Sequence, residues 1–393
     1  MNDLDNASMD AAPPAGQATA QALSQLGRQL PDWARELGFS QIGVADVHLA
    51  TAEPGLLAWL QAGFHGGMDY MAAHGLKRAR PAELVPGTVR VITARLPYLP
   101  RDTPPDWRAR EPARLALYAR GRDYHKVLRT RLQRLAERIA AAIGPFGHRV
   151  FCDSAPVLEV ELAGRSGLGW RGRHTLLLDR AAGSMFFLGE IYVDLPLPVT
   201  SPASAHCGHC TACLDACPTG AIVAPYRLDA RRCLSYLTIE HDGPIPVEHR
   251  RALGNRIYGC DDCQLACPWN KYAQRSTLPD FDARAPLDGA TLRALWAWDE
   301  PTFLRRTEGG PIRRIGHARW RRNLAVALGN AWRETGDVAL AQALQAQRPG
   351  ADALLAEHID WALAQRDGAP SSASATGMLT MPSSVDAVTS PAT

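Results

Sequence analysis

Cysteine is the residue type whose spacing in this chain most directly indicates chemistry. Eight of the nine cysteines lie between Cys207 and Cys267, in a chain of 393 residues. The first four form a C-x2-C-x2-C-x3-C-P run that ends at Pro218, and a shortened C-x2-C-x3-C-P run extends from Cys260 to Pro268. Bacterial ferredoxins use this spacing to hold two [4Fe–4S] clusters. The sequence therefore predicts two such clusters.

The ligands of each cluster follow from one property of these runs. The cysteine before each proline points away from its own run and ligates the other cluster. The first cluster is therefore predicted to bind Cys207, Cys210, Cys213 and the crossing Cys267. The second takes Cys260, Cys263 and the crossing Cys217, and Cys233, the only other cysteine of the region, completes its set. Cys152 remains a free thiol, which we expect to be buried as a small apolar side chain.

Two alternatives to redox clusters stay open for these cysteines. Pairs of the form C-x2-C also bind structural zinc, and a second alternative is that the clusters only stabilise the fold. Eight cysteines that divide into two sets of four favour iron and sulfur over zinc. Clusters held by crossed runs lie close together, which favours electron transfer between them.

Composition and charge exclude several classes of protein. Apolar residues make up 46% of the chain and charged residues 21%, which excludes a coiled coil, collagen and wholesale disorder. No stretch reaches the ~18 consecutive apolar residues that a membrane helix needs. The acidic start does not resemble a signal peptide, so we expect a cytoplasmic protein with reduced thiols. The net charge of +3 is too small to indicate nucleic-acid binding by itself.

The elements that must position the cysteines are predicted from hydrophobic periodicity. Four apolar residues at helical spacing, from Leu128 to Ile139, predict a helix over Tyr124–Ile143. A second helical pattern runs from Ala22 to Gly38, with an interruption expected at Pro31. Strands and helices mix through the rest of the first 200 residues, which predicts an α+β domain of α/β type.

The length suggests two or three domains. We predict an α+β N-terminal domain, a ferredoxin-like module that holds the cysteines, and a C-terminal domain of short helices that loosely resembles HEAT-like α-solenoid repeats. The predicted bounds are 21–200, 201–275 and 276–366, with disordered tails over 1–20 and 367–393.

Other cofactor sites leave no signature in the sequence. No Gly-x-Gly-x-x-Gly follows a predicted strand, so a Rossmann-type nicotinamide or flavin site has no support. No Asp-x-His-x-x-Gly run is present to supply a histidine to the lower face of a corrinoid. The long segments on both sides of the cysteines indicate an enzyme with a built-in electron supply.

Several further motifs resemble one known family. They are Gly121-Arg-Asp-Tyr-His125, Asp153-Ser-Ala-Pro156, Gly167-Leu-Gly-Trp170, Cys233-Leu-Ser-Tyr-Leu-Thr238, Gly254-Asn-Arg-Ile-Tyr-Gly259 with the cysteine run that follows, and Ile312-Arg-Arg-Ile-Gly316. Together with the cysteines they resemble the epoxyqueuosine reductases, from about residue 22 to about residue 366. That family reduces the epoxide of epoxyqueuosine, at the wobble position of tRNA, to the alkene of queuosine.

The resemblance implies a cofactor that the residues alone do not indicate. Epoxyqueuosine reductases use cobalamin and two [4Fe–4S] clusters, and the N-terminal domain of this chain is then the cobalamin-binding, catalytic one. The cofactor contacts that carry over by motif are Arg78, Asp153, Ser235 and Asp261. The resemblance also implies a monomer that binds tRNA, takes electrons from an external low-potential donor and binds no membrane.

Asp153 matches the position of the family's proton donor. That role requires a buried apolar setting that raises the pKa of the carboxyl group. From the residues alone, Asp153 is more readily interpreted as the N-cap of a following helix. His125 is interpreted as a structural histidine in the first turn of a helix rather than a ligand.

A basic block near the C-terminus is predicted to contact tRNA phosphates. No acidic residue occurs between Gly309 and Arg333, where a solvated helix face is the usual explanation for such a run. The predicted tRNA-binding residues are Arg313, Arg314, Arg319, Arg321 and Arg322, and Arg305 and Arg306 extend the block.

Two departures from the family and two rival functions complete the sequence prediction. Val160 stands where many members have arginine, and Arg173 where many have lysine, so position 160 is given no role.

The rival functions are a soluble corrinoid iron–sulfur enzyme like the reductive dehalogenases, and a ferredoxin-type electron carrier. The basic block argues against the first, and the long N-terminal segment against the second.

Overall fold

The computed structural model describes residues 19–101, 113–284 and 287–366. The predicted tails at 1–20 and 367–393 lie almost entirely outside the described residues. The structure mixes helices with an antiparallel sheet, as the α+β prediction requires. Among the described residues, no helix is both long enough and apolar enough to cross a membrane.

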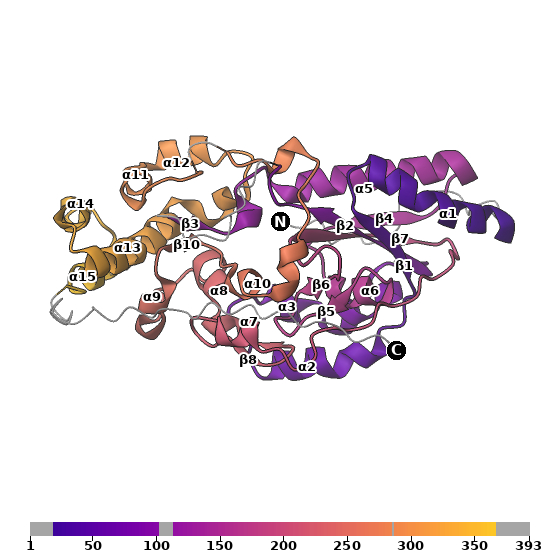
Figure 1. Cartoon of the computed structure of the whole chain (residues 1–393), viewed down its shortest axis with the longest axis horizontal. Coiled ribbons are helices and arrows are strands. Elements are labelled where there is room, and N and C mark those ends of the chain that lie inside the picture. Colours follow the sequence, from indigo (N-terminus) through magenta and orange to yellow (C-terminus); the bar gives the residue numbers. More distant parts are fainter. Residues whose placement is uncertain (1–18, 102–112, 285–286, 367–393) are drawn as a thin grey trace, which may run out of the picture.

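A four-stranded antiparallel sheet forms the centre of the N-terminal half (Figure 1). Its strand order is β1-β2-β7-β4, with β1 at Gln41–Ala45, β2 at Arg90–Pro97, β7 at Phe186–Val193 and β4 at His148–Phe151. Side chains of a strand alternate between the two faces. Ile92 and Ile191 pack into one core, and their neighbours Val91 and Tyr192 into another on the opposite face.

Two long helices cover one face of this sheet. They are α1, Ala20–Glu36, and α5, Tyr124–Ile143, which lie side by side above the strands in Figure 1. The bounds of α5 are the predicted ones, and Leu128, Leu132 and Ile139 are fully buried. The interruption expected at Pro31 was wrong: α1 continues through it, because one lost hydrogen bond is outweighed by burial of the face that includes Leu26 and Leu30.

The opposite face carries the shorter elements of this half. Helix α6, Glu159–Arg165, packs on β1, β2 and β7. The remaining elements are α2 at Glu53–Gln61, α3 at Tyr70–Ala73, α4 at Pro81–Leu84 and the hairpin of β5, Trp170–Arg171, with β6, Leu177–Leu178. This hairpin leads from the N-terminal half toward the cysteine region.

The cysteine region is built from short elements. Helix α7, Ala212–Asp215, and helix α10, Asp262–Leu265, lie within the two cysteine runs and contact each other. Between them come β8 at Ile222–Ala224, β9 at Arg227–Leu228, α8 at Leu234–Ile239, α9 at Val247–Leu253 and β10 at Arg256–Tyr258. The two runs are thus brought together in space although about 45 residues separate them.

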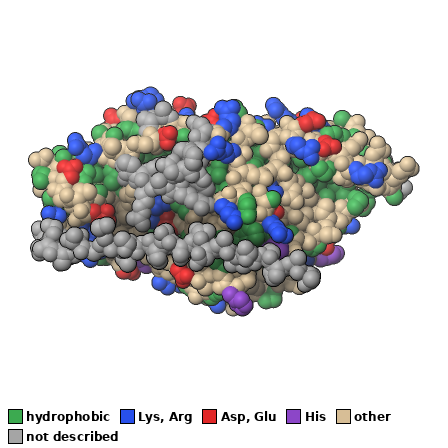
Figure 2. Space-filling model, viewed as in Figure 1, with side chains coloured by type: hydrophobic (Ala, Val, Ile, Leu, Met, Phe, Trp, Pro, Cys, Tyr) green, Lys and Arg blue, Asp and Glu red, His purple; other side chains and the backbone are tan. Residues whose placement is uncertain are grey.

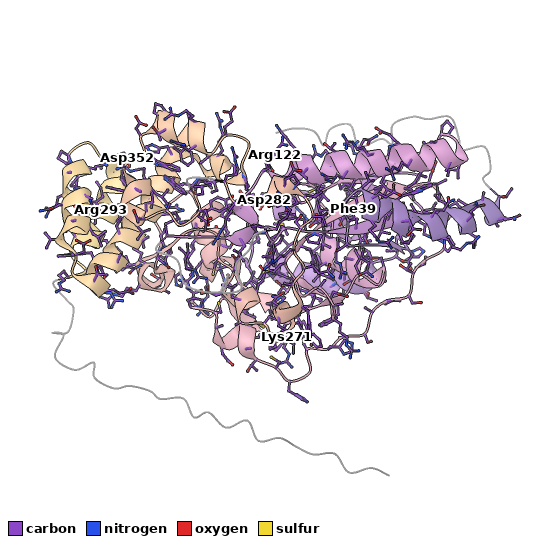
Figure 3. All side chains as sticks on the ribbon, turned by 45° about the horizontal axis from the view of Figure 1, so that its top comes forward. Phe39, Arg122, Lys271, Asp282, Arg293 and Asp352 are labelled. Atoms are coloured by element: carbon purple, nitrogen blue, oxygen red, sulfur yellow. The ribbon has the colours of Figure 1, made fainter. Side chains whose placement is uncertain are left out.

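The C-terminal helices surround one long member, α13, Gly316–Thr335. The others are α11 at Leu292–Trp296, α12 at Glu300–Arg306, α14 at Val338–Gln347 and α15 at Ala353–Leu363. In Figure 3, Arg293 and Asp352 mark these helices, Phe39 marks the sheet and Lys271 marks the loop after the second cysteine run.

The second and third predicted domains share one hydrophobic core. Leu237 of α8 and Ile257 of β10 belong to the same buried cluster as Trp320 and Leu328 of α13. Strand β3, Arg114–Leu115, pairs in parallel with β10 and brings a segment of the N-terminal half into that core. The domain bounds near residues 200 and 275 remain predictions.

Candidate active site

The structure gathers the cysteines into the two sets predicted from the sequence. One cavity, of about 240 Å³, is lined by Cys207, Cys210, Cys213 and Cys267. Another, of about 390 Å³, is lined by Cys217, Cys233, Cys260 and Cys263. The cysteine before each proline therefore lies with the cysteines of the other run. Four thiols around one space are the donor set of a [4Fe–4S] cluster.

Secondary structure fixes the sulfur positions. Cys233 is the N-cap of α8, and Cys267 precedes a 3₁₀ turn that begins at Pro268. The Trp170 indole N–H donates to Cys207 Sγ at 3.4 Å, and the Ala221 backbone N–H donates to Cys217 Sγ at 3.2 Å. Burial raises the pKa of Cys213 to about 11 and of Cys260 to about 12, so these groups are thiols until iron displaces their protons.

Asp153 lines the same cavity as the second set of cysteines. It follows β4 on a turn whose backbone has a φ of +52° at this residue. Helix α6 begins six residues later, its N-cap is Leu158, and no side chain caps it. The N-cap interpretation of Asp153 was therefore wrong. Instead the Glu159 side chain accepts a hydrogen bond from the Asp153 backbone N–H at 2.7 Å and fixes the turn.

Two neighbours from the start of α5 bind the Asp153 carboxylate. The Tyr124 hydroxyl donates to Oδ2, and the His125 Nε2 lies 3.3 Å from the same oxygen. The other ring nitrogen of His125 contacts Asp123 Oδ1 at 2.7 Å. His125 thus does stand in the first turn of a helix, yet it also joins two carboxylates at the site, a contact that the sequence did not indicate.

The electrostatics of this group differ from the expectation for Asp153. Although the Asp153 side chain is 50% exposed, desolvation by its neighbours would by itself raise its pKa, but hydrogen bonds from His125 and Tyr124 and the positive charges of His125 and Arg314 lower the pKa. Asp123 and Asp153 in turn raise the pKa of His125 to about 9, against the effect of burial. The expected raised pKa of Asp153 was wrong, and at neutral pH the proton of this pair is held on His125.

Two carboxyl groups near Asp153, half-buried Glu159 and buried Glu190, were not predicted from the sequence. Burial and the Asp153 charge raise the pKa of Glu159 to about 8. Glu190, in the middle of β7, is fully buried without a hydrogen-bond partner among the described residues, and burial raises its pKa too. A lone glutamate in the apolar run Phe186–Val193 was the sequence signal for the latter.

Of the other three predicted cofactor contacts, two line the cavity and one does not. Ser235 and Asp261 line the cavity of about 390 Å³. Asp261 is buried, accepts from the Leu117 backbone N–H at 2.7 Å, and burial raises its pKa to about 6. Arg78 is absent from the cavity wall. Its buried guanidinium donates to the Tyr70 and Met71 carbonyl oxygens, so its cofactor contact remains a prediction.

Comparison with known proteins relates these features to one family. A family model described as "4Fe-4S double cluster binding domain" matches residues 206–270, and one described as "Epoxyqueuosine reductase QueG, DUF1730" matches residues 78–154. The epoxyqueuosine reductase of Alicycliphilus denitrificans is 69% identical over 354 residues, covering 87% of this chain and 98% of that protein. The chain belongs to the epoxyqueuosine reductase family.

Further members and solved structures support the same assignment. The Escherichia coli epoxyqueuosine reductase is 54% identical over 347 residues, covering 88% of this chain and 90% of that protein. A crystal structure of an epoxyqueuosine reductase with an epoxyqueuosine-modified tRNA-Tyr stem loop matches with a TM-score of 0.75 at 26% identity, over 88% of this chain and 99% of that one. The recognition from sequence motifs is confirmed, and the two rival functions are not supported.

The cavity walls of this chain fit a large planar cofactor such as cobalamin. The aromatic rings of Tyr98, Tyr118 and Phe187 line the cavity that holds Asp153. A second cavity of about 770 Å³ adjoins it, since Glu159 and Val160 line both. Two adjoining spaces with apolar walls and a few polar groups suit a ring with appended side groups. Val160 adds an apolar side chain to this wall.

The basic block near the C-terminus divides into exposed and buried members. Arg313 and Arg314 are exposed, and Arg314 pairs with Glu240 at 3.0 Å. Arg319 is half-buried and donates to the Ile239 carbonyl at 2.8 Å, and half-buried Arg321 lies over the Trp296 ring and donates to Gln347.

Arg322 is the exception among the predicted tRNA contacts. Its side chain is fully buried and donates to the carbonyl oxygens of Leu237, His241 and Gly243, each at 2.7 Å. A guanidinium enclosed in this way cannot reach a phosphate. The predicted tRNA contact of Arg322 was therefore wrong, because a buried arginine and an exposed one look alike in sequence.

Proposed function

We propose that this chain reduces the epoxide of epoxyqueuosine in tRNA to the alkene of queuosine, the last step of queuosine modification. Removing the epoxide oxygen as water consumes two electrons and two protons. The chain must therefore deliver electrons and protons to one place. The observation that carries the proposal is that Asp153, a proton-transfer group, shares one cavity with the four cysteines of the second cluster.

The protons are supplied by the group around Asp153. The proton held on His125 lies within one hydrogen bond of Asp153 Oδ2, which opens into the cavity. Asp153 accepts this proton and passes it to the epoxide oxygen as the carbon–oxygen bond opens. Asp123 on the far side of the ring keeps His125 ready to take up the next proton. Tyr124, stacked on Phe187 at 4.2 Å, holds the carboxylate in place.

Ser235, Asp261 and the aromatic walls of the cavity would hold cobalamin, which would supply the two-electron reduction of the carbon–oxygen bond. The crossed cysteine runs would hold two adjacent clusters, which would supply electrons from an external low-potential donor to the cavity one at a time. The mostly apolar wall keeps bulk water away from the low-potential centre.

The three predicted domains divide the work of cofactor and substrate binding. Residues 21–200 form the cobalamin-binding catalytic domain, 201–275 the ferredoxin-like domain, and 276–366 a HEAT-like helical domain that binds tRNA. A tRNA stem loop accompanies the similar solved epoxyqueuosine reductase, which supports this substrate. The enzyme acts as a monomer in the cytoplasm, where its tRNA substrate is found. The anticodon loop is single-stranded, so its modified base can enter the cavity without breaking base pairs.

Replacing Asp153 by Asn tests the proposal. The variant keeps the shape of the side chain and removes its ability to carry a proton, so we expect intact clusters and cofactor but turnover lowered by about 10² to 10⁴. Conversion of an epoxyqueuosine-containing stem loop is measured by mass spectrometry, with Asp32→Asn, an exposed position on α1, as the control. Turnover near that of the unmodified enzyme in D153N would remove Asp153 from the reaction.

A further inference from the structure

His174 stands in the wall between the two sets of cysteines. It lines both the cavity of the first set and the cavity of the second. Only 3% of its surface is exposed. It lies in the turn of the β5–β6 hairpin, between Arg171 and Leu177. Neither the cluster assignment nor the proton pathway gives this side chain a role.

The hydrogen bonds of His174 determine which ring nitrogen carries the proton. The Leu176 backbone N–H donates to His174 Nδ1 at 3.2 Å. A backbone N–H can only donate, so Nδ1 is the acceptor and the ring is neutral with its proton on Nε2. Burial lowers the pKa of His174 to about 4, which agrees with a neutral ring.

The proton on Nε2 has no acceptor among the residues that the structure describes. The atom is fully buried, yet no protein group accepts its hydrogen bond. A buried donor without a partner is costly and rare in folded proteins. The residue lines the cavity enclosed by Cys207, Cys210, Cys213 and Cys267, as well as the cavity of the second set, and the sulfur atoms of a bound cluster would be the acceptors that the protein lacks.

The hairpin that carries His174 is already bound to the first cysteine run. Trp170, at its start, donates its indole N–H to Cys207 Sγ at 3.4 Å. Arg173 donates to the Gly208 carbonyl at 2.5 Å. At Gly172 a side chain would not fit, because an added Cβ would lie 2.8 Å from His174 Cε1. The imidazole is therefore held in a fixed position beside the first cluster.

We propose that His174 donates a hydrogen bond from Nε2 to a sulfur of the first cluster and thereby raises the reduction potential of that cluster. The reduced cluster carries one more negative charge than the oxidised one, so an N–H donor stabilises the reduced form more. The proposal rests on the two clusters and not on the identity of the substrate, so it can fail while the proposed function stands.

Replacing His174 by Leu removes the Nε2–H donor and puts an apolar side chain of similar size in its place. A hydrogen bond to a charged acceptor lost in this way changes the ratio of reduced to oxidised cluster about tenfold at a fixed potential. For a one-electron couple this is a shift of about 59 mV toward more negative potential. The measurement is a redox titration followed by electron paramagnetic resonance on the cluster-loaded protein, with the first-cluster signal identified from a Cys233→Ala protein that lacks the second cluster.

Two variants separate a hydrogen bond from a general loss of packing. His174→Gln places an amide N–H near the position of Nε2, so we expect its potential to return toward that of the unmodified protein. His358→Leu removes another histidine that is fully buried and whose pKa burial also lowers to about 4, but it lies on α15, away from the cysteines. This control should leave both cluster potentials unchanged.

A direct measurement decides the question even if the Leu variant does not hold its clusters. His206 lines the same cavity, so it is replaced by Gln; in this protein labelled with ¹⁵N-histidine, electron–nuclear double resonance of the reduced first cluster should detect one histidine nitrogen and one exchangeable proton. Absence of both couplings overturns the proposal, as does an unchanged potential in H174L or a shift confined to the second cluster.

Discussion

At the scale of single residues, Cys233 decides whether the second cluster can form. It stands outside both cysteine runs, at the N-cap of α8, and lines the cavity with Cys217, Cys260 and Cys263. The first set does not include it. Replacing Cys233 by Ala is expected to remove the second cluster and keep the first, so iron falls from about eight to about four atoms per chain. Iron analysis of anaerobically purified protein checks this, and eight irons with full activity in C233A would show that another ligand completes the set.

The pH dependence of the protein's stability is also determined by a few residues, those around His125. Asp123 and Asp153 raise the pKa of His125 to about 9 from its usual 6.5, with Lys126, Glu159 and Arg314 as the other charged groups nearby. The folded protein therefore holds this proton more tightly than the unfolded chain. The stabilisation is fully present below about pH 6.5 and disappears as the pH rises through about 9.

Turnover should depend on the same proton, the one held on His125. We expect the rate to fall as the pH rises through about 9, because His125 then has no proton to pass to Asp153. In a His125→Gln variant the rate should be lower throughout and this fall should be absent. The pH profile of single-turnover conversion measures both effects. An unchanged profile in H125Q would mean that Asp153 receives its protons by another route.

At the scale of elements, α13 supports the helix that carries Cys233. Arg322 of α13 donates to three carbonyl groups at and beyond the end of α8, and the neighbouring Asn323 donates to the Thr238 and Ile257 carbonyls. The last carbonyls of a helix have no partners within it. The C-terminal helices therefore supply the hydrogen bonds that complete α8 and hold the wall of the cavity.

Replacing Arg322 by Met should accordingly damage stability rather than tRNA affinity. The buried Leu237 carbonyl and the part-buried His241 and Gly243 carbonyls lose their donor, and since an unsatisfied buried group costs about 1–3 kcal/mol, we expect a loss in about this range. Arg306→Met, at an exposed position of α12, is the matched control and should leave stability unchanged. Chemical denaturation curves measure the difference. Equal stability of the two variants would contradict the role assigned to Arg322.

At the scale of the whole molecule, the distribution of charged side chains bears on where the tRNA phosphates bind. Lys and Arg side chains on the face shown in Figure 2 are spread over both halves of the molecule, with acidic residues among them. The net charge of +3 agrees with such a mixed surface. We therefore expect a local group of exposed arginines to bind the tRNA phosphates. Arg305 and Arg306 of α12 and the nearby Arg313, which donates to the Leu304 carbonyl, form such a group.

Changing Arg305, Arg306 and Arg313 to Ala should weaken tRNA binding and flatten its dependence on salt. Each lost phosphate contact lowers the slope by about 0.9 on duplex and about 0.7 on single-stranded regions. The control is a triple variant of Arg28, Arg35 and Arg134, which are exposed on α1 and α5 at the other end of the molecule. Dissociation constants at several salt concentrations give both slopes, and equal slopes would place the tRNA surface elsewhere.

The sequence by itself determined the features that depend on short spacings. The two sets of cysteines, the family and the bounds of α5 could all be predicted, because ligand runs and helical periodicity are local properties of the chain. The motif around Asp153 was also visible in the sequence. Its surroundings were not, because Tyr124 and His125 reach it from a helix almost thirty residues earlier in the chain.

Only the tertiary structure decided which charged groups are buried and what they contact. It placed Arg322 in the core and left Arg313 exposed, and it surrounded Asp153 with donors that lower its pKa. It also left the Nε2 proton of His174 without an acceptor among the described residues, in a side chain that lines the cavity of the first set of cysteines. Burial and hydrogen bonding depend on segments that are distant in sequence and meet only in the fold, so residue type and spacing do not reveal them.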